Sequence, residues 1–274
     1  MAPVIEAKNL GIHFARNRRR NKRLRDMFST ESKPDAPVRP PKKVSAAKPG
    51  GKGKGGKKRK HHEFWALRNV SFQIQPGEAV GLVGGNGQGK STLLKLIAGV
   101  LLPDAGKIRV TGGVAPLIEV TGGFEGDLTA RDNIWLTAGL HGLSKKQIAA
   151  KFDEIVDFAE VGDFLDTPFR HFSSGMKVRL GFSVITTLDE PIVLVDEVLA
   201  VGDRAFREKC YLRMQELLSG GRTLFLVSHN EGDLKRFCTR GLYLQGGTLV
   251  ADAPIGESLA LYRADIEARR AQYL

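Results

Sequence analysis

The sequence has few cysteines and no long apolar run, and each absence excludes a class of protein. Cys210 and Cys238 are the only cysteines in 274 residues and are not closely spaced, which argues against a zinc site or a disulfide scaffold. No stretch approaches the roughly 18 consecutive apolar residues of a membrane-spanning helix. The start of the chain has no basic flank leading into an apolar segment, so we expect no secretory signal. Any role at a membrane is therefore expected to depend on a partner.

The formal net charge of +12 is concentrated in one segment. Residues 15–62 contain 18 Lys and Arg against three acidic residues, so the rest of the chain is slightly acidic. Within this segment, residues 29–60 are rich in Pro, Gly and Lys and lack the apolar side chains that a core needs. We interpret residues 15–62 as a basic low-complexity insertion between two strands, disordered in isolation.

Three interpretations of the insertion remain open. It is a solvated surface segment, or it attaches the protein electrostatically to anionic lipid, where each Lys or Arg near the surface contributes on the order of 1 kcal/mol. The third interpretation is non-specific nucleic-acid binding. Phe28 is the only aromatic residue in the segment, so little base stacking is available and nucleic acid is the least favoured partner.

Outside the insertion, strand and helix patterns alternate, which predicts an α/β fold. Residues 4–14, 70–74 and 79–83 have strand patterns, and the apolar runs in "PIVLVDE" and "RTLFLVSH" are typical of buried strands in a parallel sheet. A mainly helical block is predicted at about 130–185, with Ser144 as an N-cap. The chain ends in a predicted amphipathic helix at about 252–274, and we expect one domain over residues 1–274.

A glycine-rich loop predicts a phosphate site. Gly84-Gly85-Asn86-Gly87-Gln88-Gly89-Lys90-Ser91 fits G-x-x-x-x-G-K-[ST] between a predicted strand and a predicted helix that includes Thr92. Glycines let backbone N–H groups curl around an anion, and the helix adds its positive N-terminal end. Lys90 is expected to reach the β- and γ-phosphates, and the Ser91 hydroxyl to bind Mg²⁺. The loop therefore predicts binding of a nucleoside triphosphate, with ATP and Mg²⁺ as cofactors.

Two acidic residues end the predicted strand "PIVLVDE". They come at the carboxyl edge of the sheet, where ligands bind in open α/β folds. Asp196 suits the water-mediated Mg²⁺ shell, and Glu197 is placed to act as the general base on the attacking water.

Further motifs follow in a fixed order. "FSSGM", Phe172 to Met176, resembles the LSGGQ signature of ATP-binding cassette (ABC) ATPases and precedes the acidic strand by about twenty residues. After that strand, "DEVLAVGD" resembles the family's D-loop, ending at Asp203, and "LVSHN" resembles the switch segment with His229. The resemblance covers nearly the whole chain except the insertion. It implies a phosphate-loop NTPase sheet core with an inserted helical subdomain.

The family resemblance implies roles for these residues. Two cassettes assemble head to tail, so that the signature of one, here Ser173, Ser174 and Gly175, completes the phosphate site of the other. Asp203 is then expected to couple the two sites and His229 to contact the γ-phosphate as a catalytic residue. Phe14 occupies the place of the aromatic that stacks on adenine.

The sequence departs from the usual cassette at two places. The last signature position is Met176 instead of glutamine, and the glutamine expected before the helical block is missing. Glu119 and Glu125 lie nearby, and neither is assigned to its role. Together with "LIEVTGGFEGDLTARDNI", these features resemble the ATP-binding subunits of teichoic acid, O-antigen and galactan exporters.

The expected function is therefore that of an ATP-hydrolysing motor subunit of a polysaccharide or teichoic-acid-type exporter. The expected partners are a polytopic membrane permease and a second copy of the chain, at the cytoplasmic face of the membrane. The alternatives are a cassette of another transporter class, or a soluble cassette ATPase acting on ribosomes or nucleic acid. Ribosomal cassettes usually pair two phosphate loops in one chain or carry long coiled coils, and this sequence has one loop and no heptads.

Overall fold

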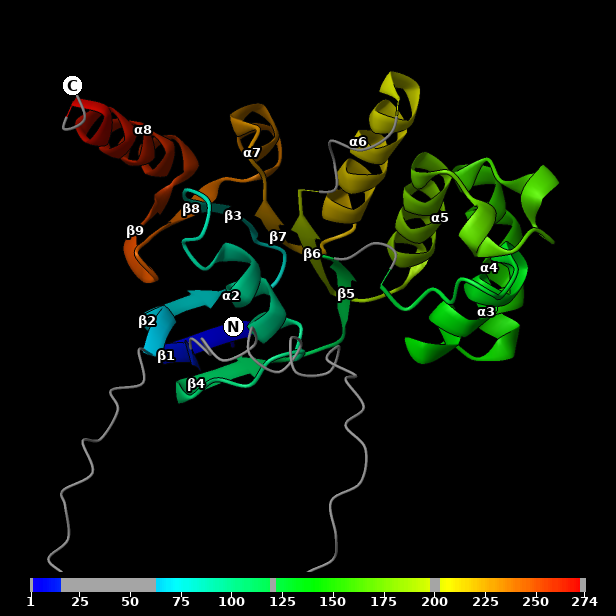
Figure 1. Cartoon of the computed structure of the whole chain (residues 1–274), viewed down its shortest axis with the longest axis horizontal. Helices are drawn as coiled ribbons and strands as arrows, with labels where there is room; N and C mark the ends of the chain where they lie inside the picture. Colours follow the sequence, from blue (N-terminus) through cyan, green and yellow to red (C-terminus); the bar gives the residue numbers. More distant parts are fainter. Residues whose placement is uncertain (1, 16–62, 119–121, 198–202, 272–274) are drawn as a thin grey trace, which may run out of the picture. The chain divides into compact units, whose positions relative to one another are not determined.

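The computed structural model describes residues 2–15, 63–118, 122–197 and 203–271 (Figure 1). The chain divides into two compact units, one made of residues 1–12 and 65–274 and the other of residues 13–64. The predicted insertion at 15–62 lies outside the described residues, apart from the backbone of Ala15. The fold below is that of the larger unit.

Within the described residues, a six-stranded sheet has the order β5-β6-β7-β3-β8-β9. The strands from β5 to β8 pair in parallel, and β9 pairs with β8 antiparallel. The strands are β3 (Ala79–Val83), β5 (Val114–Leu117), β6 (Ile192–Asp196), β7 (Thr223–Val227), β8 (Arg240–Gln245) and β9 (Thr248–Pro254). The expected α/β class is confirmed.

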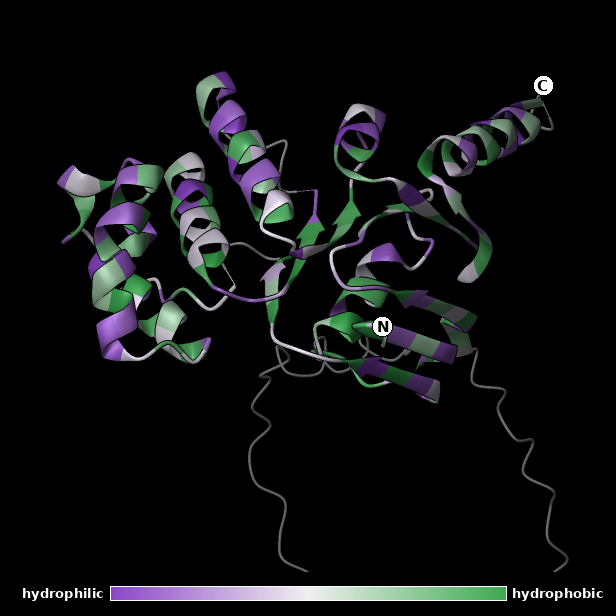
Figure 2. Ribbon diagram, turned by 180° about the vertical axis from the view of Figure 1, so that it is seen from behind, coloured by the Kyte–Doolittle hydropathy of each residue, from purple (hydrophilic) through white to green (hydrophobic). Residues whose placement is uncertain are grey.

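The central strands are apolar because both of their faces are covered. On β6, Ile192 and Leu194 belong to the hydrophobic core on one side of the sheet, whereas Val193 and Val195 belong to the core on the other. Figure 2 shows these strands coloured largely hydrophobic, with hydrophilic bands along the surrounding helices. A strand buried on both faces has no polar alternation, which explains the continuous apolar runs in the sequence.

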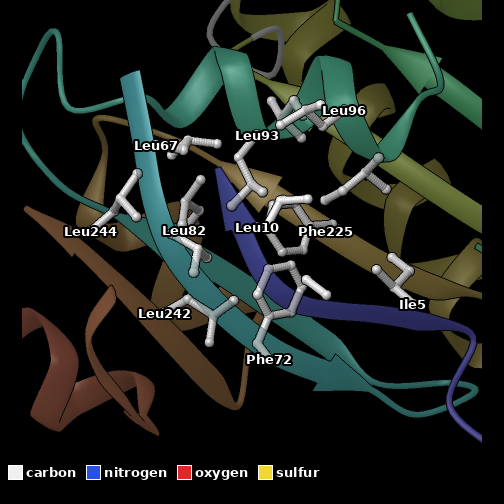
Figure 3. Packing of buried hydrophobic residues seen from close by; sticks show 14 of the residues in the cluster. Ile5, Leu10, Leu67, Phe72, Leu82, Leu93, Leu96, Phe225, Leu242 and Leu244 are labelled. Carbon is white, nitrogen blue, oxygen red and sulfur yellow. The ribbon is translucent and has the colours of Figure 1, made fainter. Parts of the chain in front are cut away.

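One core lies between this sheet and a second sheet of order β2-β1-β4 in the described part of the chain. Its strands are β1 (Ile5–Ala15), β2 (Glu63–Ile74) and β4 (Ala105–Val110), with β4 antiparallel to β1. Figure 3 shows Leu10, Leu67, Leu82 and Phe225 pointing toward Leu93 of helix α2 (Lys90–Ile97). Burial of this cluster holds the start of α2 against the sheet, and α2 follows the glycine-rich loop directly.

Three helices form a block with its own small core, built around residues such as Ile134, Ile155 and Leu180. They are α3 (Ala130–Leu140), α4 (Lys145–Ala159) and α5 (Ser174–Thr187), with short 3₁₀ turns at Gly162–Phe164 and Phe169–His171. Ser144 caps α4 through a capping box with Gln147, as the sequence predicted. The block places the signature segment at the start of α5.

Three further helices cover the opposite face of the main sheet, where they contribute to the other core. They are α6 (Arg204–Ser219), α7 (Glu231–Phe237) and α8 (Ile255–Ala271). The last helix begins at Ile255, later than the predicted start at about 252. Residues 252–254 remain in β9 because Asp252 forms a two-bonded ion pair with Arg240 of β8. Among the helices of the described residues, none has the length and apolar content to cross a membrane.

Candidate nucleotide-binding and catalytic site

The glycine-rich loop joins β3 to α2 and closes around a lysine ammonium. Lys90 Nζ donates to the carbonyl oxygens of Gly84 at 2.9 Å and Gly85 at 3.0 Å. The Lys90 side chain is buried, and burial lowers its pKa, while the nearby charges of Glu197 and Asp196 act in the opposite direction. The ammonium is thus held at the centre of the loop by carbonyls, with two carboxylates in its electrostatic reach.

Gly89 is required where the loop enters the helix. Its φ is +99°, in the left-handed region, and a Cβ there would lie 2.5 Å from the carbonyl oxygen of Ala66 and 2.8 Å from Leu67 Cδ2. Strand β2 therefore approaches the loop so closely that only glycine fits. This contact fixes where the first free N–H groups of α2 point.

Gln88 ties the loop to the turn between β8 and β9. The Gly246 N–H donates to Gln88 Oε1 at 2.5 Å, and Gln88 Nε2 donates to the Asn86 carbonyl at 3.4 Å. Asn86 and Gly87 are exposed at the tip of the loop, and Thr92 follows in the first turn of α2. All nine predicted loop residues therefore lie in one segment that backs onto the main sheet.

The acidic strand end meets the start of α2. The Ser91 hydroxyl hydrogen-bonds to the Asp196 carboxylate, and burial raises the Asp196 pKa despite that bond. Ser91 and Asp196 thus supply two adjacent hard oxygen ligands, the type that Mg²⁺ prefers, so the residues present fit this ion.

Glu197 and His229 face each other across two neighbouring strands. Glu197 Oε1 lies 2.7 Å from His229 Nε2, and the Glu197 N–H donates to the Val227 carbonyl at 2.9 Å. Glu197 directly follows the last paired residue of β6 and has a φ of +58°, which is unusual for a residue with a side chain. Since β6, β7 and β3 are consecutive in the sheet, Glu197 and His229 meet beside Lys90.

A polar network that the sequence did not indicate supports the switch segment. Asp233 is buried, and it accepts hydrogen bonds from Tyr211 Oη at 2.6 Å and Ser228 Oγ at 3.3 Å. Ser228 Oγ in turn accepts from the Asn230 N–H at 3.0 Å. This network fixes the turn that carries His229. From the sequence, this network could have been found only through a motif or a helical spacing that links its residues. Tyr211 and Asp233 are linked by neither.

The signature residues form a separate depression with Asp203. Ser173 is the N-cap of α5, where its Oγ accepts from the Met176 N–H at 3.2 Å. The depression has a volume of about 580 Å³, and its lining includes Ser173, Ser174, Gly175, Met176, Val178, Arg179 and Asp203. No residue of the glycine-rich loop lines it. The signature and the loop of one chain therefore present two distinct surfaces.

Asp203 is the N-cap of α6 and contacts the signature helix. Its Oδ1 accepts from the Phe206 N–H at 2.9 Å, and its other oxygen forms an ion pair with Arg179 of α5. The Phe206 N–H bond and the Arg179 charge hold the pKa of Asp203 below its usual range. Arg179 was not a candidate from the sequence, because its partner lies 24 residues away in another element.

Three other candidate residues have less defined surroundings. Phe14 lies in β1, in the smaller unit, with 46% of its surface exposed. Glu125 is exposed, while its backbone is held by the buried side chain of Asn133 through bonds of 2.7 and 2.9 Å. Glu119 lies outside the described residues. The replacement of the missing glutamine therefore stays unassigned.

Comparisons with known proteins give the family and the relatives of this chain. A family model described as ABC transporter matches residues 67–200. The chain is 42% identical over 204 residues to the O-antigen export system ATP-binding protein RfbB of Klebsiella pneumoniae, covering 74% of this chain and 83% of RfbB. It is 45% identical over 187 residues to the ABC transporter protein AbcA of Aeromonas salmonicida, covering 68% of this chain and 61% of that protein.

A third relative is longer than this chain. The teichoic acids export ATP-binding protein TagH of Lactococcus lactis is 41% identical over 197 residues, which are 72% of this chain and 42% of TagH. Among solved structures, the dimeric ATP-binding cassette MJ0796 bound to ADP and Pi superposes with a TM-score of 0.66 at 19% identity, covering 92% of this chain and 98% of that one. This structural likeness confirms the predicted cassette fold.

The fold and the loop define a phosphate-loop ATPase. The chain belongs to the ABC transporter family, as an ATP-binding protein of that family. The predicted subgroup is confirmed as well, since relatives from O-antigen and teichoic acid export systems match over most of the chain.

Proposed function

We propose that this chain is the motor subunit of an exporter that moves a cell-surface polysaccharide or teichoic-acid-type polymer across the cytoplasmic membrane. The similarity to RfbB over 83% of that protein's length carries this proposal. The ABC transporter family model also matches residues 67–200, which include most of the residues expected to bind and hydrolyse ATP. Membership of the ABC transporter family alone would not explain why proteins of polymer-export systems, such as RfbB and TagH, match over most of this chain.

The geometry of the site supports the chemistry that we propose for it. The N–H groups of the Gly84–Ser91 loop and the Lys90 ammonium bind the phosphates of ATP. Ser91 and Asp196 hold Mg²⁺, which neutralises phosphate charge when bound. Glu197 removes a proton from the attacking water, and His229, 2.7 Å from Glu197, orients that carboxylate and contacts the γ-phosphate.

A second copy completes the site. The N-terminus of α5, with Ser173, Ser174 and Gly175, faces the γ-phosphate held by the other copy, where a helix N-terminus stabilises negative charge. Asp203 couples the two sites, and Phe14 stacks on the adenine. Because the signature depression shares no lining residue with the loop of its own chain, a head-to-tail homodimer satisfies both surfaces.

The expected location is the cytoplasmic face of the membrane, bound to a polytopic permease. ATP binding closes the dimer and hydrolysis reopens it, and this cycle drives the permease between its states. The basic residues of the insertion add electrostatic attachment to anionic lipid headgroups.

A substitution at the general base tests the hydrolytic mechanism. Glu197→Gln removes the proton acceptor but keeps the size of the side chain, so we expect ATP binding to persist and hydrolysis to fall at least about 100-fold. Glu208→Gln on α6 is the control, because Glu208 is an exposed carboxylate that pairs with Arg204 of the same helix. Near-normal turnover of Glu197→Gln in a phosphate-release assay would show that Glu197 is not the general base.

Co-purification tests the export function. The tagged chain is extracted from membranes with mild detergent after nuclease treatment, and the bound proteins are identified by mass spectrometry. We expect a polytopic membrane protein in a roughly equal amount. Recovery with ribosomal proteins, without any membrane protein, would favour the soluble alternative.

A further inference from the structure

Arg179 connects the signature helix to two other helices. Its Nη1 lies 2.6 Å from Glu160 Oε2, and its Nη2 pairs with the Asp203 carboxylate. Its guanidinium also lies over the Phe206 ring, 5.0 Å from the centroid. The side chain is only 20% exposed although it carries a full charge, so it is held in one place. The three partners come from the end of α4 and the start of α6.

The partners of Arg179 are themselves fixed. Glu160 is the C-cap of α4, in a left-handed conformation with a φ of +56°, and it also pairs with Lys209 of α6. Asp203 caps α6 through the Phe206 N–H. We call the five residues Glu160, Arg179, Asp203, Phe206 and Lys209 the Arg179 bridge. The bridge joins the end of α4, the signature helix α5 and the first turns of α6.

We propose that Arg179 is a positioning residue, which locks the signature segment and Asp203 into one unit that meets the nucleotide of the second copy. The proposal rests on the proposed function, because it assumes that the signature acts across a dimer. Arg179, Ser173 and Asp203 line the same depression, so the bridge fixes the two functional groups relative to each other at the surface they share.

The consequence for the reaction is geometric. A helix N-terminus stabilises transition-state charge only when its N–H groups point at the developing oxyanion, and a displacement of about 1 Å can lower a rate on the order of 100-fold. Without the bridge, the start of α5 loses its polar links to α6, so Ser173 and Asp203 are no longer held in one fixed arrangement toward the partner. Arg179 does not line the phosphate loop, so binding of ATP to the loop of its own chain is unaffected.

The chain contains a matched control. Arg213 of α6 pairs with Glu154 of α4, lies 5.2 Å from the centroid of the Phe158 ring, and has a side chain 18% exposed. Its chemistry and burial are thus almost those of Arg179, and it also joins α6 to α4. Neither Arg213 nor its partners line the signature depression.

The experiment compares Arg179→Gln with Arg213→Gln in the full-length chain. For each variant we would measure the melting temperature, the Kd for ATP from a fluorescent analogue, and kcat and KM for ATP hydrolysis. We expect similar decreases in melting temperature, because equivalent contacts are removed. Only Arg179→Gln should lower kcat, by tenfold or more, with the Kd unchanged within about twofold.

Two outcomes overturn the proposal: kcat of Arg179→Gln within twofold of the wild type, or an equal loss of kcat in both variants. If Arg179→Gln does not fold, Arg179→Lys and Arg213→Lys are compared by the same measurements, since lysine keeps the charge but cannot bridge two carboxylates. A failure of the proposed hydrolytic mechanism can be told apart from a failure of the Arg179 proposal. In the first case Glu197→Gln would remain active, regardless of the result for Arg179→Gln.

Discussion

At the scale of single residues, Lys90 has the most constrained environment in the site. Its ammonium is buried, bonded to two loop carbonyls and close to two carboxylates. Burial alone would disfavour a charge, so the carbonyls and carboxylates keep the cation in place until phosphate oxygens become its partners. We therefore propose that the lysine contributes mainly to nucleotide affinity.

We predict that Lys90→Ala weakens ATP binding by about 10- to 150-fold, the range expected when a charge-assisted bond of roughly 1.5–3 kcal/mol is lost. Isothermal titration calorimetry of the purified chain measures this change. Lys95→Ala, in the last turn of the same helix, is the control and should keep the wild-type affinity. An unchanged Kd for Lys90→Ala would contradict the role assigned to the loop.

Sequence motifs were enough to locate individual residues where local order determines their positions. Lys90 and Ser91 come at the end of the glycine-rich loop, and Asp196 ends strand β6. A parallel sheet brings both positions to the same edge, so the sequence was enough to predict that these residues meet there. Arg179 and Asp233 were missed because their partners come from other elements. Contacts of that kind depend on how helices pack, which no motif or periodicity encodes.

At the scale of elements, the junction between the loop and α2 depends on glycines of two kinds. Gly89 has both a left-handed backbone and no room for a Cβ, whereas Gly87 has a left-handed backbone with open space around it. Alanine at Gly87 therefore meets only backbone strain, about 1 kcal/mol. Alanine at Gly89 meets that strain and a collision with β2.

We predict that Gly89→Ala lowers stability by about 2 kcal/mol or more and abolishes measurable ATP binding, since β2 and the loop must separate. Gly87→Ala should lower the free energy of unfolding by about 1 kcal/mol at most, because alanine adds only backbone strain at this position. Chemical denaturation and nucleotide titration of both variants separate the two effects. Equal losses would mean that the close approach of Ala66 to Gly89 does not constrain the loop.

Elements with strong local signals agreed with their predictions. Strand β3 spans the predicted residues 79–83, and Ser144 caps α4. The start of the last helix was predicted too early, because the Arg240–Asp252 pair keeps β9 in the sheet through Pro254. Strand β4 was not predicted, since its mostly exposed residues have no apolar alternation and it forms by pairing with β1.

At the scale of the whole molecule, the insertion separates two strands of one sheet. Strands β1 and β2 are neighbours in the order β2-β1-β4, and their apolar residues within the larger unit belong to one core. The free energy of closing a connection changes only with the logarithm of its length, so shortening the connection has little effect on stability.

We predict that deleting residues 29–60 changes the melting temperature by no more than a few degrees, because that stretch contains no predicted core residue. Co-sedimentation with vesicles containing anionic lipid should decrease in the deletion variant, with neutral vesicles as the control. Collapse of the melting transition would show that the segment belongs to the fold. Unchanged co-sedimentation would show that the segment does not attach the protein to anionic lipid. Nuclease-sensitive binding of the full-length chain would instead support the interpretation that the segment binds nucleic acid.

The backbone of Glu197 has a consequence for the evolution of the whole protein. A glutamate at a φ of +58° is held in a conformation that glycine adopts without strain, which lowers the stability of the fold by about 1 kcal/mol. We therefore expect Glu197→Gly to melt at a higher temperature than Glu197→Ala, while both variants are inactive. Selection for thermal tolerance alone would favour loss of the proposed general base at this position, and only selection for ATP turnover opposes it.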